Sequence, residues 1–208
     1  MTASVDAAIE AIGRGGLAVV PVDTVYGLVC SASDDAAIDR LSTLKGRDPA
    51  KPTALVAASV DAVLQCVPEL RGRIERVLRS LLPGPLTLVL PNPAERLPSL
   101  GGGDPDTIGV RVPALASPWR ELLERAGPLA ATSANLAGGR DPRRLDEVPG
   151  ELLEGVDAVV DGGELPGVPS TVVDLTGAEP HVLREGAVSA ADVLARVAAA
   201  TAAVGPDI

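Results

Sequence analysis

The sequence predicts an α/β fold, in which an open, twisted, mixed β-sheet is flanked by helices within one domain of residues 1–208. Segments with apolar residues three and four positions apart alternate with short β-branched runs, which are typical of helices and buried strands respectively. These runs outnumber the strands of a simple βαβ repeat, so the sheet is expected to be mixed. Hydrophobic residues make up 46% of the chain and aromatic residues 1%, so Leu, Val, Ile and Ala must fill the core.

Helices are predicted where the apolar spacing is helical, and several begin with a residue that favours helix initiation. The expected segments are 4–12, 34–44, 59–64, 71–82, 119–127 and a final helix after Ser189. Ser33 and Ser59 can cap their helices, and Ser117 precedes a proline suited to the first helical position. Ser189, with an aspartate three residues on, resembles a capping box.

Strands are predicted over the β-branched runs. The expected strands are 17–22, 53–57, 86–90, 107–112, 129–132, 157–161, 170–175 and 181–184. Residues 90–106, rich in Pro and Gly, form the longest expected loop, and a loop of that length in a compact domain is mobile or functional. Residues 201–208 are expected to form a tail beyond a core of about residues 5–200.

Charge and residue counts exclude several classes of protein. The formal net charge of -10 argues against a broad basic surface for duplex nucleic acid, while leaving room for a local basic cleft. One histidine and two cysteines are too few for a His/Cys zinc cage or a disulfide scaffold, which suits a reducing cytoplasm. No apolar run approaches the ~20 residues of a membrane span, and the N-terminal segment is acidic where a signal peptide is basic. A cytoplasmic protein without a membrane partner is therefore expected.

Common nucleotide-binding and hydrolase motifs are absent. The chain has no GxxxxGK[ST] sequence, and residues 13–18 (GRGGLA) precede a strand, whereas the dinucleotide fingerprint follows one. Ser133 lacks the flanking glycines of a nucleophile elbow, and a Ser-His-Asp triad would depend on the single His181. The chemistry is therefore expected to use other groups.

The two lysines of the chain lie close together. Lys45 and Lys51 flank Arg47 within LKGRDPAKP, and all other Lys and Arg positions of the chain are arginine. Lysine is a compact point charge that can approach one phosphate oxygen. The segment therefore predicts phosphate binding, with the alternative that it is a solvated helix C-terminus whose cations suit the helix dipole.

Polar residues at strand ends predict further parts of an anion site. Residues 23–24 follow a buried strand, and TSAN (132–135) ends another before a glycine-rich loop. Arg111 lies in an otherwise apolar strand, where it is costly unless paired with a carboxylate or phosphate. Ser170 and Arg184 add a hydroxyl and a cation at strand ends, although each such segment alone also fits an ordinary polar turn. Cations gathered in one cleft of an acidic protein fit a polyanionic small molecule such as a nucleotide.

The order of these segments resembles the YrdC/Sua5 family, in its short bacterial form (TsaC type), over about residues 16–185. The segments that carry the resemblance are PVDTVYGL, LKGRDPAKP, PGPLTLVLP, GVRVP, TSANLAG, PSTVVDLT and LREG. The K-x-R and S-x-N pairs, Lys45 with Arg47 and Ser133 with Asn135, are specific in combination with TVYGL. The resemblance implies the YrdC-like open twisted mixed sheet around a central basic groove, without the C-terminal domain of the longer Sua5 type.

The activity that the resemblance implies is that of a nucleotidyltransferase. It would join L-threonine, bicarbonate or CO2, and ATP into L-threonylcarbamoyladenylate and diphosphate. This product would serve the N6-threonylcarbamoyl modification of adenosine 37 in tRNA, with a separate TsaD-type complex making the transfer. Mg²⁺ is expected to arrive with ATP, because the sequence shows no dedicated carboxylate cage and hence no resident metal. Weak binding of tRNA is also expected.

Carried over position by position, the resemblance assigns two groups of residues. The residues expected to hold threonine are Thr24, Arg111, Ser170 and the backbone of Ala131. The residues expected around ATP are Lys45, Arg47, Lys51, Thr107, Ser133, Asn135, Asp141 and Arg184, with Lys45, Arg47, Ser133 and Asn135 as the catalytic set. Arg111 would clamp the carboxylate of threonine, and the other cations would neutralise the triphosphate.

Some positions depart from the family pattern, and two other functions stay open. Asp48 stands where many members have proline, and Val56 where archaeal-type members have a histidine that contacts threonine. One alternative is carbamoyl transfer from carbamoyl phosphate, as in HypF proteins, which carry YrdC-like domains in much longer chains. Another is a non-catalytic RNA-binding module, which the acidic balance and the scarcity of aromatic residues disfavour.

Overall fold

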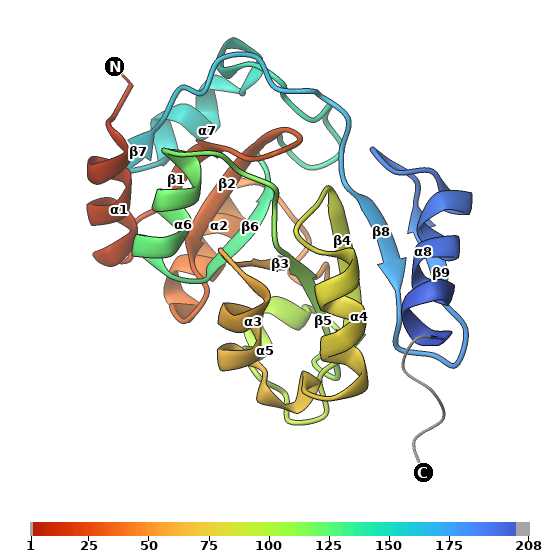
Figure 1. Ribbon diagram of the computed structural model, residues 1–208. Helices are drawn as coiled ribbons and strands as arrows, with labels where there is room; N and C mark the ends of the chain where they lie inside the picture. The colour runs from red at the N-terminus through yellow and green to blue at the C-terminus, as the bar shows by residue number, and fades with distance from the viewer. Residues whose placement is uncertain (1, 203–208) are drawn as a thin grey trace.

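One mixed sheet runs through the computed structural model, which describes residues 2–202 (Figure 1). Its nine strands lie in the order β7-β1-β2-β6-β3-β5-β4-β8-β9. They are β1 (Ala18–Pro21), β2 (Tyr26–Ser31), β3 (Ala54–Val56), β4 (Leu86–Pro91), β5 (Thr107–Arg111), β6 (Leu129–Ser133), β7 (Ala158–Val159), β8 (Thr171–Asp174) and β9 (His181–Arg184). Three strand pairs are parallel and five are antiparallel, which confirms the predicted mixed α/β sheet.

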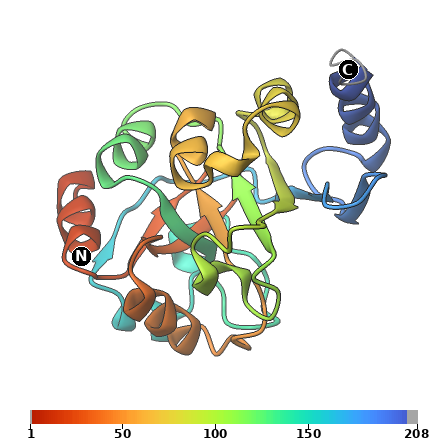
Figure 2. The ribbon, with the colours of Figure 1, turned by 90° about the horizontal axis from the view of Figure 1, so that it is seen from below.

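Helices cover both faces of the sheet, because alternate side chains of a strand point to opposite sides. On β1, Val19 belongs to the same core cluster as α2, whereas Ala18 and Val20 belong to the cluster of α1 and α6. Figure 2 shows α1 and α6 together, and α2 on the other side of the strands. The helices are α1 (Val5–Gly13), α2 (Asp35–Leu44), α3 (Val60–Cys66), α4 (Arg73–Leu81), α5 (Pro98–Gly101), α6 (Trp119–Ala126), α7 (Gly150–Gly155) and α8 (Ala190–Ala202), with short 3-10 turns at Pro68–Leu70 and Leu145–Glu147.

The structure contains one strand that the sequence does not predict. No strand is predicted over residues 23–28, but β2 begins at Tyr26 and pairs antiparallel with β1 through a four-residue turn. Gly27, which suggests a turn, instead lies inside β2, where a Cβ atom would come within 3.0 Å of the Val22 side chain. The glycine therefore allows the hairpin to pack closely and does not end a strand.

Two helix starts differ from the predicted ones. Asp34, and not Ser33, caps α2, since its Oδ1 accepts from the backbone N–H three residues on at 3.0 Å. The first turn of α6 follows Pro118, and no side chain caps it, so Ser117 has no capping role there. The predicted caps of α3 and α8 are confirmed.

The expected loop and tail contain regular structure in part. Within residues 90–106, β4 continues to Pro91 and α5 forms a single turn. The last helix continues to Ala202, two residues into the expected tail, and residues 203–208 lie outside the described residues. Across residues 2–202, no helix has both the length and the apolar character that crossing a membrane requires.

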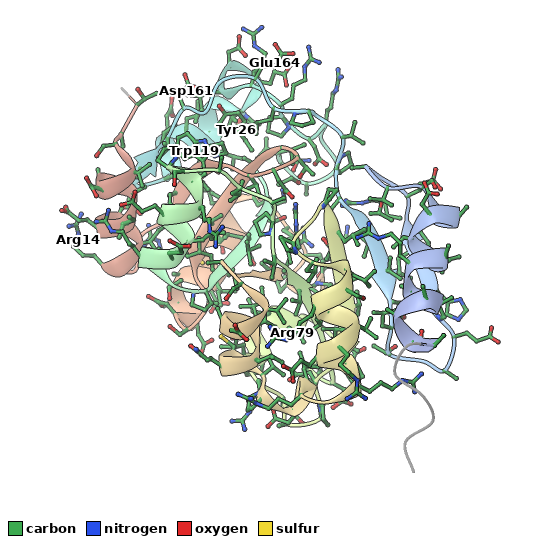
Figure 3. The ribbon with its side chains drawn as sticks, viewed as in Figure 1. Arg14, Tyr26, Arg79, Trp119, Asp161 and Glu164 are labelled. Carbon is green, nitrogen blue, oxygen red and sulfur yellow. The ribbon has the colours of Figure 1, made fainter. Side chains whose placement is uncertain are left out.

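Residues 160–170, called here the crossover segment, connect β7 near one end of the sheet to β8 near the other (Figure 1). The β1–β2 hairpin holds this segment. The Oη atom of Tyr26 lies 3.0 Å from Asp161 Oδ1 and 2.9 Å from the Gly163 carbonyl, and Gly167 N–H donates to the Thr24 carbonyl at 2.9 Å. Figure 3 shows Tyr26 beside Asp161. The hairpin therefore fixes the path by which the chain reaches β8.

Candidate active site

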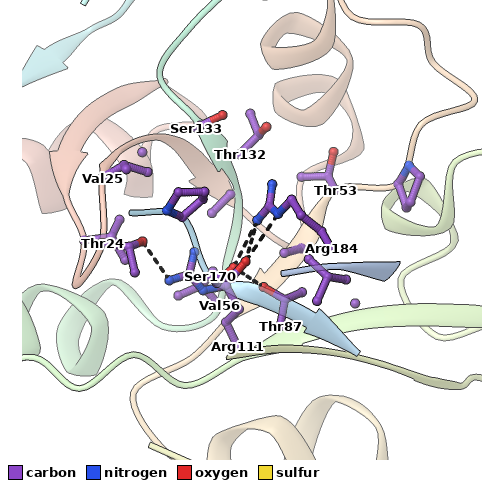
Figure 4. Close-up of a pocket in the computed structure, with 18 of the residues that line it drawn as sticks. Thr24, Val25, Thr53, Val56, Thr87, Arg111, Thr132, Ser133, Ser170 and Arg184 are labelled. Atoms are coloured by element: carbon purple, nitrogen blue, oxygen red, sulfur yellow. Dashed lines mark hydrogen bonds between the residues drawn. The ribbon is translucent and has the colours of Figure 1, made fainter. Parts of the chain in front are cut away.

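A cavity of about 290 Å³, lined by polar and apolar side chains, lies over the central strands, between the β1–β2 turn, the segment before β8, and β9 (Figure 4). Nine of the twelve site residues predicted from the sequence line it: Thr24, Arg47, Thr107, Arg111, Ala131, Ser133, Asp141, Ser170 and Arg184. These residues come from segments far apart in the chain. The fold thus brings three arginines of an acidic protein into one cavity.

The β1–β2 turn holds Arg111, the last residue of β5. Arg111 Nη2 donates to Asp23 Oδ1 at 2.6 Å and to Thr24 Oγ1 at 3.2 Å. The side chains of Arg111 and Asp23 are 13% and 6% exposed. Burial lowers the pKa of Arg111 and raises that of Asp23, and the attraction between the two charges opposes both shifts. The ion pair therefore fixes the direction of a guanidinium that burial alone would disfavour.

Arg184, the last residue of β9, reaches to Ser170 just before β8. Its Nε and Nη2 donate to the Ser170 carbonyl at 3.3 and 2.9 Å, and Nη2 is 3.3 Å from Ser170 Oγ. Ser170 Oγ lies 2.8 Å from Thr87 Oγ1 on β4 (Figure 4). The charge of Arg184 contributes, after burial, to the lowered pKa of Arg111. The two guanidinium groups therefore both contribute positive charge to the same part of the cavity.

Arg47 lies at the β6 side of the cavity. Its Nη1 donates to Thr132 Oγ1 at 3.1 Å and its Nη2 to the Pro52 carbonyl at 2.7 Å. The Nε atoms of Arg47 and Arg111 are buried and have no hydrogen-bond partner among the residues that the structure describes. Because a buried N–H without an acceptor is unfavourable, both arginines can gain from an anionic oxygen of a ligand.

Lys45 is 3% exposed and lies behind the cavity wall with Asn135. Its ammonium donates to the Ser133 carbonyl and, at 2.7 Å, to both the carbonyl and Oδ1 of Asn135. Ser133 Oγ donates to Asn135 Oδ1 at 2.6 Å, and Asn135 Nδ2 donates to the Gly139 carbonyl at 2.6 Å. Burial, with the nearby charge of Arg47, lowers the pKa of Lys45 to about 8. The K-x-R and S-x-N pairs thus meet, with Lys45 holding the turn that presents Ser133.

Besides Lys45 and Asn135, one predicted site residue does not line the cavity, and three residues at the site are missing from the predicted set. Lys51 is exposed and does not belong to the cavity lining. The predicted set lacks Asp23, which holds Arg111, and the cavity hydroxyls of Thr87 and Thr132. Asp23 could have been found from the sequence, because a buried Arg111 requires a carboxylate or phosphate partner and Asp23 follows a buried strand.

The chemistry of the lining suits anions better than metals. Arginines and hydroxyl groups line the cavity, and in residues 2–202 no group of three or more His, Cys, Asp and Glu side chains is placed to hold a metal ion. Arginine guanidinium groups bind carboxylate and phosphate oxygens in fork geometry. The arrangement can therefore hold a carboxylate near Arg111 and phosphate groups near Arg47 and Arg184.

Comparison with known proteins shows the family of this chain. The Sua5_yciO_yrdC family model, described as "Telomere recombination", matches residues 10–186. The chain belongs to the YrdC/Sua5 family. This confirms the resemblance on which the predicted site residues depend, and the open mixed sheet is the expected YrdC-like fold.

Three YrdC/Sua5 relatives show the extent of the similarity. A threonylcarbamoyl-AMP synthase of Pyrococcus abyssi (strain GE5 / Orsay) is 39% identical over 178 residues, 84% of this chain and 52% of that protein. A relative from Mycobacterium tuberculosis (strain ATCC 25618 / H37Rv) is 35% identical over 88% of this chain and 83% of its own length. The crystal structure of P. abyssi Sua5 complexed with L-threonine matches with a TM-score of 0.84 and 34% identity, over 92% of this chain and 56% of that one. This chain thus spans about half of the archaeal relative and most of the mycobacterial one.

Proposed function

We propose that this protein is a threonylcarbamoyl-AMP synthase, which forms L-threonylcarbamoyladenylate and diphosphate from L-threonine, bicarbonate and ATP. The observation that carries the proposal is the shared cavity of Arg47, Arg111 and Arg184, in which two buried Nε atoms lack an acceptor within residues 2–202. Two findings on relatives support this choice of substrates: the P. abyssi relative bears the name of that enzyme, and P. abyssi Sua5 has been crystallised in complex with L-threonine.

The substrates divide between the two sides of the cavity. Arg111 binds the carboxylate of threonine, with the hydroxyls of Thr24 and Ser170 and the backbone of Ala131 nearby. Arg47, Arg184, Thr107, Ser133 and Asp141 surround MgATP, in which Mg²⁺ enters as part of the substrate. Lys45 and Asn135 act from behind the wall by holding Ser133 in place. Lys51 is not included in the proposed site.

The reaction proceeds in two steps that need no nucleophile from the protein. The threonine amine attacks the carbon of bicarbonate, with loss of water, or of CO2, with loss of a proton from the amine to solvent. The resulting carbamate carries a negatively charged oxygen. That oxygen attacks the α-phosphorus of ATP, a bond to the α-phosphorus forms, and the bond to the leaving diphosphate breaks. The arginines hold the anions in place and stabilise the charge that grows on diphosphate. Positioning and electrostatics therefore account for the rate enhancement.

The product and its location follow from the same proposal. A carbamoyl adenylate is labile in water, so it must pass quickly to an acceptor, and we assign that role to a TsaD-type complex that modifies adenosine 37 of tRNA. Any contact of this chain with tRNA is weak, since its net charge is -10. The cytoplasm is the compartment that fits tRNA modification and the free thiols of Cys30 and Cys66.

The test is release of diphosphate by the purified protein given MgATP and bicarbonate with each of several amino acids. The expected result is release that depends on L-threonine, together with a product of the mass of L-threonylcarbamoyladenylate. Release with carbamoyl phosphate in place of threonine and bicarbonate would favour carbamoyl transfer. Tight RNA binding with steep salt dependence and no turnover would favour the RNA-binding module.

A further inference from the structure

The long Pro- and Gly-rich loop between β4 and β5 is held in one conformation by its own hydrogen bonds. Asn92, which follows β4 and is 1% exposed, donates through Nδ2 to the carbonyls of Arg96 and Pro105, each at 2.9 Å. In the same loop, Ser99 Oγ of α5 donates to Asp35 Oδ1 of α2 at 2.6 Å. The role of this loop therefore follows from what it contacts.

One side of the loop packs on the chain that follows Arg47. The backbone N–H of Thr53 donates to the carbonyl of Leu100 in the loop at 2.9 Å. The backbone N–H of Gly103 in the loop donates to the carbonyl of Ala50, also at 2.9 Å. Two backbone hydrogen bonds thus tie the loop to the chain that carries a cation of the cavity.

The carbonyl that orients Arg47 lies between these two hydrogen bonds. The Pro52 carbonyl accepts from Arg47 Nη2 at 2.7 Å, and Arg47 Nη1 donates to Thr132 Oγ1 at 3.1 Å. The Nε atom of the same guanidinium is buried and has no acceptor among the described residues. The position of Pro52 therefore helps to decide where the guanidinium faces.

Gly102 allows the loop to approach this segment closely. Its φ of 62° and ψ of −121° suit glycine alone. A Cβ atom at this position would lie 2.5 Å from the Ala50 carbonyl oxygen and 2.8 Å from the carbonyl carbon of Lys51. Both neighbours are backbone atoms, so the chain would have to move by about 1 Å to restore ordinary contact distances. The missing side chain of Gly102 thus keeps the chain after Arg47 in its place.

We propose that Gly102 is a positioning residue for Arg47, through which the loop between β4 and β5 sets the place of this cation in the cavity. None of residues 100–103 lines the cavity, so the loop acts without touching the substrate. A displacement of a reacting group by about 1 Å can cost about 100-fold in rate. The proposal rests on the proposed function in taking MgATP as the ligand of Arg47.

The experiment compares Gly102→Ala with Gly72→Ala, a control with nearly the same backbone strain. Gly72 has a φ of 89° and a ψ of −123°, and no atom lies within 4 Å of a Cβ built there, before α4. Both substitutions are expected to lower the urea unfolding midpoint. For Gly102→Ala we expect the dissociation constant of MgATP, by titration calorimetry, to rise about fivefold and diphosphate release to fall about tenfold. The KM of threonine stays unchanged in both variants, and Gly72→Ala binds MgATP like the wild type.

A double variant separates positioning from general damage. In an Arg47→Ala background, Gly102→Ala is expected to lower diphosphate release by less than a further twofold, because the group that it positions is gone. If Gly102→Ala does not fold, Ser99→Ala replaces it, since it loosens the same loop by removing the bond to Asp35 without a clash. Ser99→Ala is expected to raise the dissociation constant of MgATP about twofold.

Two outcomes would overturn the role of Gly102. A full tenfold loss of activity in the Arg47→Ala background would show that Gly102 acts independently of Arg47. Binding of MgATP by Gly102→Ala, or by Ser99→Ala in its place, that equals that of Gly72→Ala would show that the loop does not place the cation. Because calorimetry needs no turnover, MgATP binding that depends on Gly102 without threonine-dependent diphosphate release would contradict the proposed function alone.

Discussion

Asp23 and Arg111 form a buried ion pair in which Asp23 Oδ1 lies 2.6 Å from Arg111 Nη2. The other carboxylate oxygen accepts from the backbone N–H of Ala114 at 3.3 Å, so Asp23 also ties the hairpin turn to the chain after β5. One Nη atom of the guanidinium is thus engaged before any ligand binds, and its Nε stays without an acceptor among the described residues. Under the proposed function, the carboxylate of threonine would complete the hydrogen bonding of this preorganised arginine.

Arg111→Ala is expected to raise the KM of threonine about 100-fold while changing the KM of ATP little, because the lost contact is to the amino acid. Steady-state diphosphate release at varied threonine and ATP measures the two constants. Equal rises in both would contradict the assignment of the carboxylate to Arg111.

The same substitution is expected to lower the free energy of unfolding by about 3 kcal/mol, since it leaves the Asp23 carboxylate buried without its cation. The double variant Asp23→Asn with Arg111→Ala removes that unpaired charge and should recover much of the loss. Urea unfolding of the three proteins makes the comparison, and a double variant less stable than Arg111→Ala would argue against the buried pair.

Arg47 and Lys45 are expected to differ although they are two residues apart. Arg47→Ala removes a cavity cation and should lower diphosphate release about 100-fold with little change in the unfolding midpoint. Lys45→Ala should lower both activity and stability, by about 2–4 kcal/mol, because it leaves buried acceptors of Ser133 and Asn135 without their donor. A Lys45→Ala protein with wild-type stability would show that Lys45 does not hold this turn.

The sequence predicts the strands that carry strong β-branched runs, and it misses β2 because Gly27 and the polar residues before it are typical of a turn. Most site residues could be found because their motifs occur in a family order. The sequence could not show that Lys45 points behind the wall, since both faces of that turn are polar and only packing decides between them. It also could not show that Leu183 is an extra residue of β9, between the residues that pair with Val172 and Val173 of β8. This β-bulge depends on how β9 pairs with β8, which the local sequence does not show.

Tyr26 is the single tyrosine of the chain, so its ionisation can be followed alone at 295 nm. Burial, with the hydrogen bond to Asp161, raises the pKa of Tyr26 from 10 to about 12. The folded protein is therefore expected to show only a small fraction of phenolate at about pH 11, whereas the urea-unfolded chain titrates near pH 10. A folded-state midpoint near 10 would mean that the phenol is not buried against the crossover segment.

This raised pKa also determines whether Tyr26 stabilises or destabilises the folded protein as the pH rises. Between pH 10 and 12 the folded state retains the phenol proton that the unfolded chain loses, so the contribution of Tyr26 is complete below pH 10 and disappears as the pH rises through 12. Tyr26→Phe is expected to remove this part of the pH dependence. The buried Cys30 thiol, whose pKa burial also raises to about 12, contributes equally to both proteins and cancels in the difference.

Gly186 lies where the chain after β9 passes the end of the crossover segment. A Cβ atom at this position would overlap the Pro169 carbonyl oxygen and lie 2.7 Å from the Ser170 carbonyl oxygen. Both neighbours are backbone atoms, so relief requires the crossover segment to move and Ser170 to shift. Gly186→Ala is expected to destabilise the protein by about 1–3 kcal/mol, the usual cost of forced backbone shifts, and to lower activity at least tenfold.

Gly13→Ala is the matched control, because no atom lies within 4 Å of a Cβ built at the end of α1. It is expected to leave activity unchanged and to keep or slightly raise stability, since alanine favours helix. Urea unfolding and diphosphate release are measured for both variants. The KM of threonine is the constant most sensitive to a shift of Ser170, which the proposed function places beside threonine. If Gly186→Ala behaved like Gly13→Ala, the contact between the two segments would have no role in placing Ser170, and Arg184 and Thr87 would have to hold it.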